Sequence, residues 1–167
     1  MALFILKVTK YYSKIKVFLK RVINRLRRLK YDNQTSRWLW FVFSITIKKI
    51  FAGGLSKKEQ EDIYLDYMLW HLCSYQKVDC LSGNTAVERF EKIKKKKISL
   101  FFQFSNTVFV VENEVNFNSA KLNETVQYFD SWEVSDCYVM DHYGEWCFIT
   151  THEQDYGLGP YFIENNR

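Results

Sequence analysis

The sequence predicts an α+β domain in which N-terminal helices pack on a mostly antiparallel sheet of at least four strands. Two helix-start signals lie in the middle of the chain, and two pairs of strand-like segments follow, each joined by a short polar turn. Helices that precede paired strands indicate an α+β fold, because a parallel sheet requires the two to alternate. A chain of 167 residues, 47% of them hydrophobic, is long enough for one domain with its own core.

The N-terminal segment differs in charge from the rest of the chain. Residues 1–31 contain ten Lys or Arg and no Asp or Glu, whereas the remainder contains 14 basic and 19 acidic residues. From Ile15 to Leu29, apolar residues recur at spacings of three and four, which is typical of one face of a helix. We therefore predict a basic amphipathic arm over residues 1–35 and a single α+β domain over residues 36–167.

Two interpretations of the arm stay open. Residues 1–30 suit binding to an anionic membrane surface, or a solvated helix whose apolar stripe packs on the domain. The polar face carries no aromatic side chains that would stack on bases, so we do not expect nucleic acid binding. The longest apolar run, Trp38–Ile47, is shorter than the roughly 20 residues that a membrane-spanning helix requires.

Two capping boxes mark the predicted helices. Ser56-Lys-Lys-Glu59 predicts a helix from residue 57 to about residue 72, because the hydroxyl and the carboxylate each satisfy a free backbone amide. Thr85-Ala-Val-Glu88 predicts a shorter helix that ends in a solvated terminus at the lysines of residues 94–97. An earlier apolar run over residues 38–51 fits either a buried strand or a buried helix. The residues expected to face inward from the two capped helices are Ile63, Tyr67, Trp70, Val87, Phe90 and Ile93.

Strand signals dominate the second half of the chain. Residues 98–112 contain two runs rich in β-branched and aromatic residues around a turn at residues 105–106, which predicts a hairpin. Residues 136–153 repeat this pattern around the polar turn 142–145 and predict a terminal hairpin. Between the two hairpins, residues 113–130 are polar and predict a loop that carries a short helix.

The order of landmarks from Leu55 onward resembles a known family. The matching pieces are Leu55-Ser-Lys-Lys-Glu-Gln-Glu-Asp-Ile-Tyr-Leu-Asp66, Leu69-Trp-His71, Ser74-Tyr75, Asp79-Cys-Leu-Ser-Gly83, Phe90, Phe109-Val-Val-Glu-Asn113, Tyr138-Val-Met-Asp141, Trp146, Thr151-His-Glu153 and Gly159-Pro-Tyr-Phe162. Over about residues 50–162 the chain is similar to a small bacterial family catalogued as a domain of unknown function, number 4275. The resemblance implies a fold unit without an assigned activity. The connection 116–135 is longer than in the family pattern, and the basic arm lies outside it.

The cysteines predict a reduced, cytoplasmic protein. The apolar run Ala2–Leu6 has five residues and no basic stretch ahead of it, which is too short for a secretory leader. Without that leader we expect the thiols to stay reduced. The sequence contains no paired Cys-x-x-Cys, no His-Glu-x-x-His and no Gly-rich phosphate loop, so we predict no metal and no cofactor. The four cysteines are Cys73, Cys80, Cys137 and Cys147.

One candidate site has the residue types of a thiol-dependent hydrolase. Cys147 would be the nucleophile, His152 the base, and Asp141 or Glu153 the carboxylate that orients it. The spacing argues against this set, because residues 147 and 152 on one strand point to opposite faces unless a bulge intervenes. A small buried side chain is the simpler interpretation of Cys147, which Trp146 and Phe148 flank.

The other candidate is a binding rim at one edge of the sheet. Its polar and aromatic residues are His152, Glu153, Tyr161, Phe162 and Trp146. Alternatively, the tail is architectural: Pro160 ends strand pairing, Tyr161 and Phe162 fill the core, and His152 hydrogen-bonds the backbone of the tail.

We therefore expect a non-catalytic protein-binding module of the bacterial cytoplasm, in the manner of an immunity or antitoxin protein. This expectation rests on an acidic domain rich in aromatic residues and without a coherent catalytic set. The alternatives are a small hydrolase that uses Cys147 and His152, and a peripheral membrane protein attached through residues 1–30. The sequence does not determine the partner or the oligomeric state.

Overall fold

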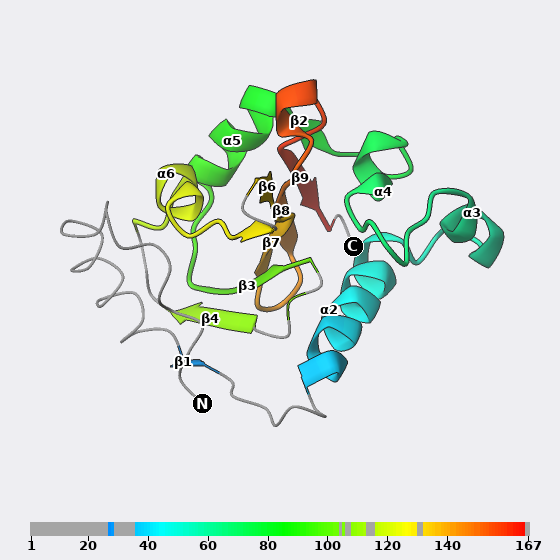
Figure 1. Cartoon of the computed structure of the whole chain (residues 1–167), viewed down its shortest axis with the longest axis horizontal. Helices are drawn as coiled ribbons and strands as arrows, with labels where there is room; N and C mark the ends of the chain where they lie inside the picture. Colours follow the sequence, from blue (N-terminus) through cyan, green and yellow to red (C-terminus); the bar gives the residue numbers. More distant parts are fainter. Residues whose placement is uncertain are drawn as a thin grey trace.

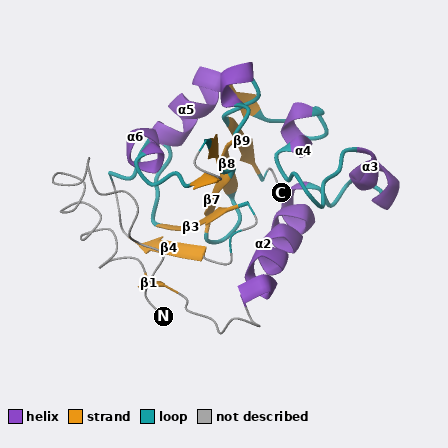
Figure 2. Cartoon of the chain, in the orientation of Figure 1, coloured by secondary structure: helices purple, strands orange, loops and turns teal. Residues whose placement is uncertain are grey.

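The computed structural model describes residues 27–28, 36–103, 105, 108–112, 116–129 and 132–165 (Figure 1). Its main element is a seven-stranded antiparallel sheet in the order β1-β4-β3-β7-β8-β9-β2. The helices cover both faces of this sheet, with α2 on one side and α5 and α6 on the other (Figure 2). The predicted α+β class with a mostly antiparallel sheet is confirmed. The strands are β1 (Arg27–Arg28), β2 (Leu81–Ser82), β3 (Lys97–Phe102), β4 (Val108–Glu112), β7 (Cys137–Asp141), β8 (Trp146–Thr150) and β9 (Tyr161–Glu164), and β5 (Tyr128–Phe129) pairs separately with β6 (Glu133–Val134).

Both predicted hairpins are present. β3 pairs with β4, and β7 pairs with β8 across the turn that contains Gly144. A further pairing between β3 and β7 joins the two hairpins into one sheet. The polar connection between them carries the predicted short helix, α6 (Ser119–Asn123), which Asn118 caps by accepting the amide of Lys121.

The apolar run 38–51 forms a helix, α2 (Ser36–Phe51), and not a strand. At the start of the chain, the predicted amphipathic helix lies outside the described residues except at its end. There the structure differs from the prediction, because Arg27 and Arg28 are extended and pair with Val110 and Phe109 of β4. The edge of a sheet offers free backbone groups that an adjacent segment can pair with.

The predicted helix over residues 57–72 is interrupted. The capping box is present: Ser56 accepts the Glu59 amide, and the Glu59 carboxylate accepts the Ser56 amide at 2.8 Å. However, α3 (Lys57–Asp62) ends early, and α4 (His71–Ser74) is a separate helix. The reason is that Ile63 and Leu65 are both buried, whereas residues two apart on a helix point in nearly opposite directions.

Of the three residues expected to face inward from that helix, two are buried and one is exposed. Ile63 and Trp70 are buried as predicted, but Tyr67 is 64% exposed, so its prediction was wrong. Tyr64 occupies the left-handed region with φ +51°, which is where the helical path breaks.

The helix α5 (Gly83–Lys92) begins two residues before its predicted cap. The Thr85 hydroxyl donates to the Ser82 carbonyl at 2.7 Å, so it does not cap the helix as predicted. Phe90 is buried, as expected. The lysine run is not wholly solvated, because Lys95 is buried over the Phe90 ring and donates to the carbonyls of Phe90 and Ile93.

Two hydrophobic clusters fill the space on either side of the sheet. The α2 cluster lies between the sheet and α2 and α4, and includes Ile47, Leu72, Cys147 and Tyr161. The α5 cluster lies between the sheet and α5 and α6, and its larger members are Phe90, Phe102, Phe148, Phe162 and Trp146. In the described part of the chain, no helix combines the length and the apolar character that crossing a membrane requires.

Candidate functional site

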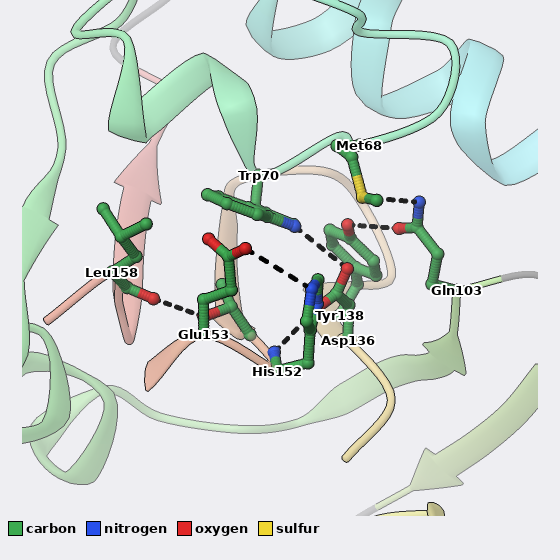
Figure 3. Close-up of polar contacts among 9 residues, drawn as sticks. Met68, Trp70, Gln103, Asp136, Tyr138, His152, Glu153 and Leu158 are labelled. Atoms are coloured by element: carbon green, nitrogen blue, oxygen red, sulfur yellow. Dashed lines mark hydrogen bonds and ion pairs between the residues drawn. The ribbon is translucent and has the colours of Figure 1, made fainter. Parts of the chain in front are cut away.

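A buried carboxylate organises the polar groups on the α4 side of the sheet (Figure 3). Asp136 immediately precedes β7, and its side chain is 2% exposed. One carboxylate oxygen accepts the Trp70 indole N–H at 2.9 Å, and the other accepts the backbone N–H of His152 at 2.8 Å. A buried charge is tolerated only where such donors satisfy it. Asp136 therefore ties the start of α4 to the turn after β8.

The same carboxylate orients an imidazole ring. His152 Nδ1 lies 2.8 Å from Asp136 Oδ1, so Nδ1 is the nitrogen that donates when the ring is neutral. The other nitrogen, Nε2, lies 3.7 Å from a carboxylate oxygen of Glu153. The His152 side chain is 29% exposed and meets the Trp70 ring edge to face at 6.1 Å. This geometry suits either a polar anchor for a bound molecule or a general base.

A second chain of hydrogen bonds lies beside the first (Figure 3). The Tyr138 hydroxyl donates to Gln103 Oε1 at 2.6 Å, and the Gln103 amide nitrogen lies 3.7 Å from the sulfur of Met68. The Gln103 backbone N–H donates to the Asp136 carbonyl at 2.8 Å. Burial raises the pKa of Tyr138 well above its ordinary value, so this phenol stays neutral and serves the packing.

The structure does not assemble the predicted thiol, imidazole and carboxylate set. Cys147 is fully buried in the α2 cluster, where burial raises the pKa of its thiol, and its sulfur lies 3.9 Å from the Phe148 carbonyl. Asp141 is at the far end of β7 and accepts the Tyr143 amide at 2.8 Å. The described contacts of His152 lead to Asp136 and Glu153 and not to Cys147.

Three residues of the predicted binding rim lie in the interior. Trp146 and Phe162 are buried in the α5 cluster and Tyr161 in the α2 cluster, so only His152 and Glu153 of that set reach solvent. The tail is part of the sheet, because β9 pairs with β8 and β2 directly after Pro160. Pro160 therefore does not end pairing.

The side chain that fastens the segment before β9 is also not the predicted one. Thr151 donates its hydroxyl to the Leu158 carbonyl, whereas His152 turns to Asp136. Thr151 therefore takes the role that the architectural interpretation gave to His152.

The family model described as "Domain of unknown function (DUF4275)" matches residues 22–162. The chain belongs to this family. The match begins inside the predicted arm and well before residue 50, so the arm is not wholly outside the DUF4275 pattern. No curated protein and no solved structure matches the chain.

The DUF4275 domain exposes three tyrosines from one short segment, residues 63–75. Tyr64 and Tyr67 are 63% and 64% exposed, and Tyr75 is 50% exposed. Of the three, Tyr67 is the residue predicted to face inward, and Tyr64 and Tyr75 belong to pieces that carry the family resemblance. We call these three residues the tyrosine surface.

Fixed polar contacts hold the backbone of this segment in place. His71 Nδ1 lies 2.6 Å from the Ile63 carbonyl, and its ring meets that of Tyr75 edge to face at 5.1 Å. Trp70, inside the same segment, donates to the buried Asp136. The contacts of His71 therefore brace the segment internally, and the Trp70 hydrogen bond ties it to the residue before β7.

Among the residues that the structure describes, no three His, Cys, Asp or Glu side chains are grouped so as to hold a metal ion. Asp136 was missed in the sequence because it belongs to no local motif. Its partner Trp70 lies 66 positions earlier in the chain.

Proposed function

We propose that this DUF4275 domain is a non-catalytic protein-binding module of the bacterial cytoplasm, acting in the manner of an immunity or antitoxin protein. The tyrosine surface is the observation that carries the proposal. Tyrosine supplies a large amphipathic contact area and loses little conformational freedom on binding, and it is enriched among residues that dominate interface energies.

The strained backbone of Tyr64 adds support. A bulky side chain in the left-handed region costs on the order of 1–3 kcal/mol and persists where the surrounding structure holds it. Such outliers gather at binding and switch regions. Here the residue that bears the strain is also 63% exposed.

The hydrogen bonds of Asp136 support the proposal, because they hold the segment that carries the tyrosine surface. Both carboxylate oxygens accept hydrogen bonds from the protein itself, through Trp70 and His152. A catalytic acid or base would need free capacity toward a substrate, and only the Nε2 atom of His152 has it. The hydrolase alternative has less support, because a nucleophilic thiolate needs access and Cys147 is fully buried.

Attachment to an anionic membrane through residues 1–30 stays a prediction. Apart from Arg27 and Arg28, these residues lie outside the described part of the chain. The proposal of a protein partner does not depend on them.

The test compares capture of partners by matched variants. The surface variant carries Tyr64→Ser, Tyr67→Ser and Tyr75→Ser. The control carries Tyr128→Ser and Tyr156→Ser, which remove tyrosines that are 69% and 85% exposed on other elements. We expect the wild type and the control to retain one protein at stoichiometric amounts from a lysate of the source bacterium. The surface variant should bind that purified protein at least about tenfold more weakly.

Equal affinity of the surface variant and the wild type would overturn the assignment of the surface. Failure of the wild type to retain any stoichiometric protein would overturn the proposed function itself. Circular dichroism and thermal unfolding of each variant establish that the fold is intact.

A further inference from the structure

Acidic side chains accompany the tyrosine surface. Between residues 59 and 76 the chain contains four Asp or Glu and no Lys or Arg. Three of these acids, Glu61, Asp62 and Asp66, are exposed like the tyrosines near them in the chain. Figure 1 shows α3, which carries the first two, at the periphery of the molecule. Carboxylates and phenol rings are therefore exposed together on one segment.

Lysines offset this negative charge only in part. Lys48 pairs with Asp66, and the Lys57 ammonium lies 3.7 Å from the Glu61 carboxylate. The Asp66 and Glu61 side chains stay 75% and 61% exposed in these pairs, and ion pairs so exposed contribute little to stability. Asp62 has no ion pair among the described residues. A cation on another molecule can therefore reach all three carboxylates.

Two of the acids lie where the helix itself disfavours them. Glu61 and Asp62 are the last residues of α3, and its last turn contains no basic residue. The carbonyl groups at the C-terminal end of a helix carry partial negative charge, so a carboxylate there is destabilising. Lys57 compensates poorly, because a Lys four residues before a Glu is the weaker order of such a pair. The placement favours a role for these carboxylates other than stabilising the fold.

We propose that the partner of the tyrosine surface presents a basic protein surface with exposed arginine side chains. This inference rests on the proposed function and names the chemistry of its partner. A guanidinium group stacks on the face of a tyrosine ring and also donates two parallel hydrogen bonds to a carboxylate, which a lysine ammonium cannot do. Tyr64 and Tyr67 both lie within two residues of Asp66 in the chain, so neighbouring arginines meet a ring and a carboxylate together.

The same charge disfavours other classes of macromolecule. DNA, RNA and anionic lipid surfaces all present phosphate groups, which the carboxylates beside the tyrosines repel. The basic residues of this chain are concentrated in residues 1–31, which contain ten Lys or Arg. A second copy of the chain would offer that basic segment, so the test separates a second copy from a different protein.

The test neutralises two acids and keeps the three tyrosines. The acid variant carries Glu61→Gln and Asp62→Asn. The charge control carries Glu124→Gln and Asp155→Asn, which make the same chemical changes at exposed positions elsewhere in the domain. The probe is the protein that the wild type retains from the lysate, after purification. Its association and dissociation rates are measured at about 0.15 M and about 1 M salt.

We expect the acid variant to bind the probe about tenfold more weakly at the lower salt concentration. Most of this loss should be in the association rate, because opposite charges at an interface steer the encounter. At the higher salt concentration, which screens the charges, the difference should shrink to about twofold or less. The charge control should bind like the wild type. The urea midpoint of the acid variant should equal or exceed that of the wild type, because the two carboxylates oppose the helix dipole.

Chemical modification tests the arginines of the partner. Treatment of the free probe with phenylglyoxal, followed by removal of the reagent, should abolish its binding to the wild type. Prior formation of the complex should protect the probe from that loss. Unchanged binding of the modified probe would overturn the proposal.

Equal affinity of the acid variant and the wild type, with weak binding by the surface variant, would overturn this inference and leave the proposed function standing. Sedimentation of the wild type alone tests for a second copy. Self-association that the acid variant abolishes would make the occupant another copy of this chain and would also overturn the inference. Failure of the wild type to retain any protein would overturn the proposed function and this inference together.

Discussion

On the α5 side of the sheet the interior contains Phe and Trp rings beside one thiol, Cys137, whereas on the α2 side two buried thiols, a buried tyrosine hydroxyl and the hydrogen bonds of Asp136 accompany the rings. Phe90 stacks on Phe148 with centroids 4.2 Å apart, and Trp146 stacks on Phe162 at 5.7 Å. Opposite them, Cys147 and Tyr161 belong to the α2 cluster. The same strands supply both sides.

The alternation of side chains along each strand distributes neighbouring residues between the two sides of the sheet. Successive side chains of a strand point to opposite faces, so Cys147 and Phe148 enter different clusters although they are neighbours in the chain. The segment on which the proposed function rests packs on the α2 side, where Trp70 donates to Asp136. The comparison indicates that the α5 side is apolar packing, and that the α2 side holds the segment that carries the proposed binding surface.

Alkaline pH should have the largest effect and should act on both sides alike. Cys137 and Cys147 are fully buried, one on each side, and burial raises the pKa of each thiol well above the value of about 8.5 that the unfolded chain has. Above that pH the unfolded state loses protons that the native state keeps, so stability falls as pH rises. Two such groups lower the free energy of unfolding by about 5 kcal/mol between pH 8.5 and 10.5.

Urea denaturation at a series of pH values under reducing conditions measures this slope. Cys137→Ala and Cys147→Ala should each reduce it by about 1.4 kcal/mol per pH unit, because each removes one thiol that the native state keeps protonated. A slope that neither substitution changes would show that the decline at high pH has another origin.

Truncation of ring side chains should distinguish the two sides. Phe90 is fully buried and contacts three other rings, so Phe90→Ala should destabilise the domain by about 4 kcal/mol. Phe51→Ala, on the α2 side, removes a ring without a stacking partner among the described residues and should cost about 1 kcal/mol less. Chemical denaturation measures both. Equal losses would mean that ring stacking adds nothing to burial on the α5 side.

Local signals predicted the elements that depend on near neighbours. The two hairpins follow from β-branched and aromatic runs around polar turns, and the Ser56–Glu59 capping box sets the start of α3. Each of these involves residues within a few positions of one another. The burial of Cys147 also followed from its flanking aromatic residues.

Features that depend on distant contacts could not be predicted. The helix over residues 57–72 breaks because Ile63 and Leu65 are both buried in the α2 cluster, whereas two residues so spaced on one helix point in nearly opposite directions. Asp136 is defined by Trp70 and His152, neither of which is near it in the sequence. The composition of the C-terminal tail predicts a segment that fills the core beyond the end of strand pairing. Its pairing with β8 and β2 makes it a strand.

The smallest of the expected effects tests whether the α2 side depends on polar contacts as the α5 side depends on rings. Asp136→Asn keeps the size of the side chain but leaves only one oxygen acceptor, so either the Trp70 indole or His152 loses its partner. An unsatisfied buried donor costs about 2 kcal/mol. Asp155→Asn, at an exposed position, is the control and should change stability by less than about 0.5 kcal/mol.

A double-mutant cycle with Trp70→Phe isolates the indole contact from the loss of packing. If the hydrogen bond holds the 63–75 segment to the sheet, the two substitutions should couple by about 1 kcal/mol in urea denaturation. Additive losses would place the stability of the α2 side in its apolar packing. The two sides would then differ in composition, but apolar packing would stabilise both.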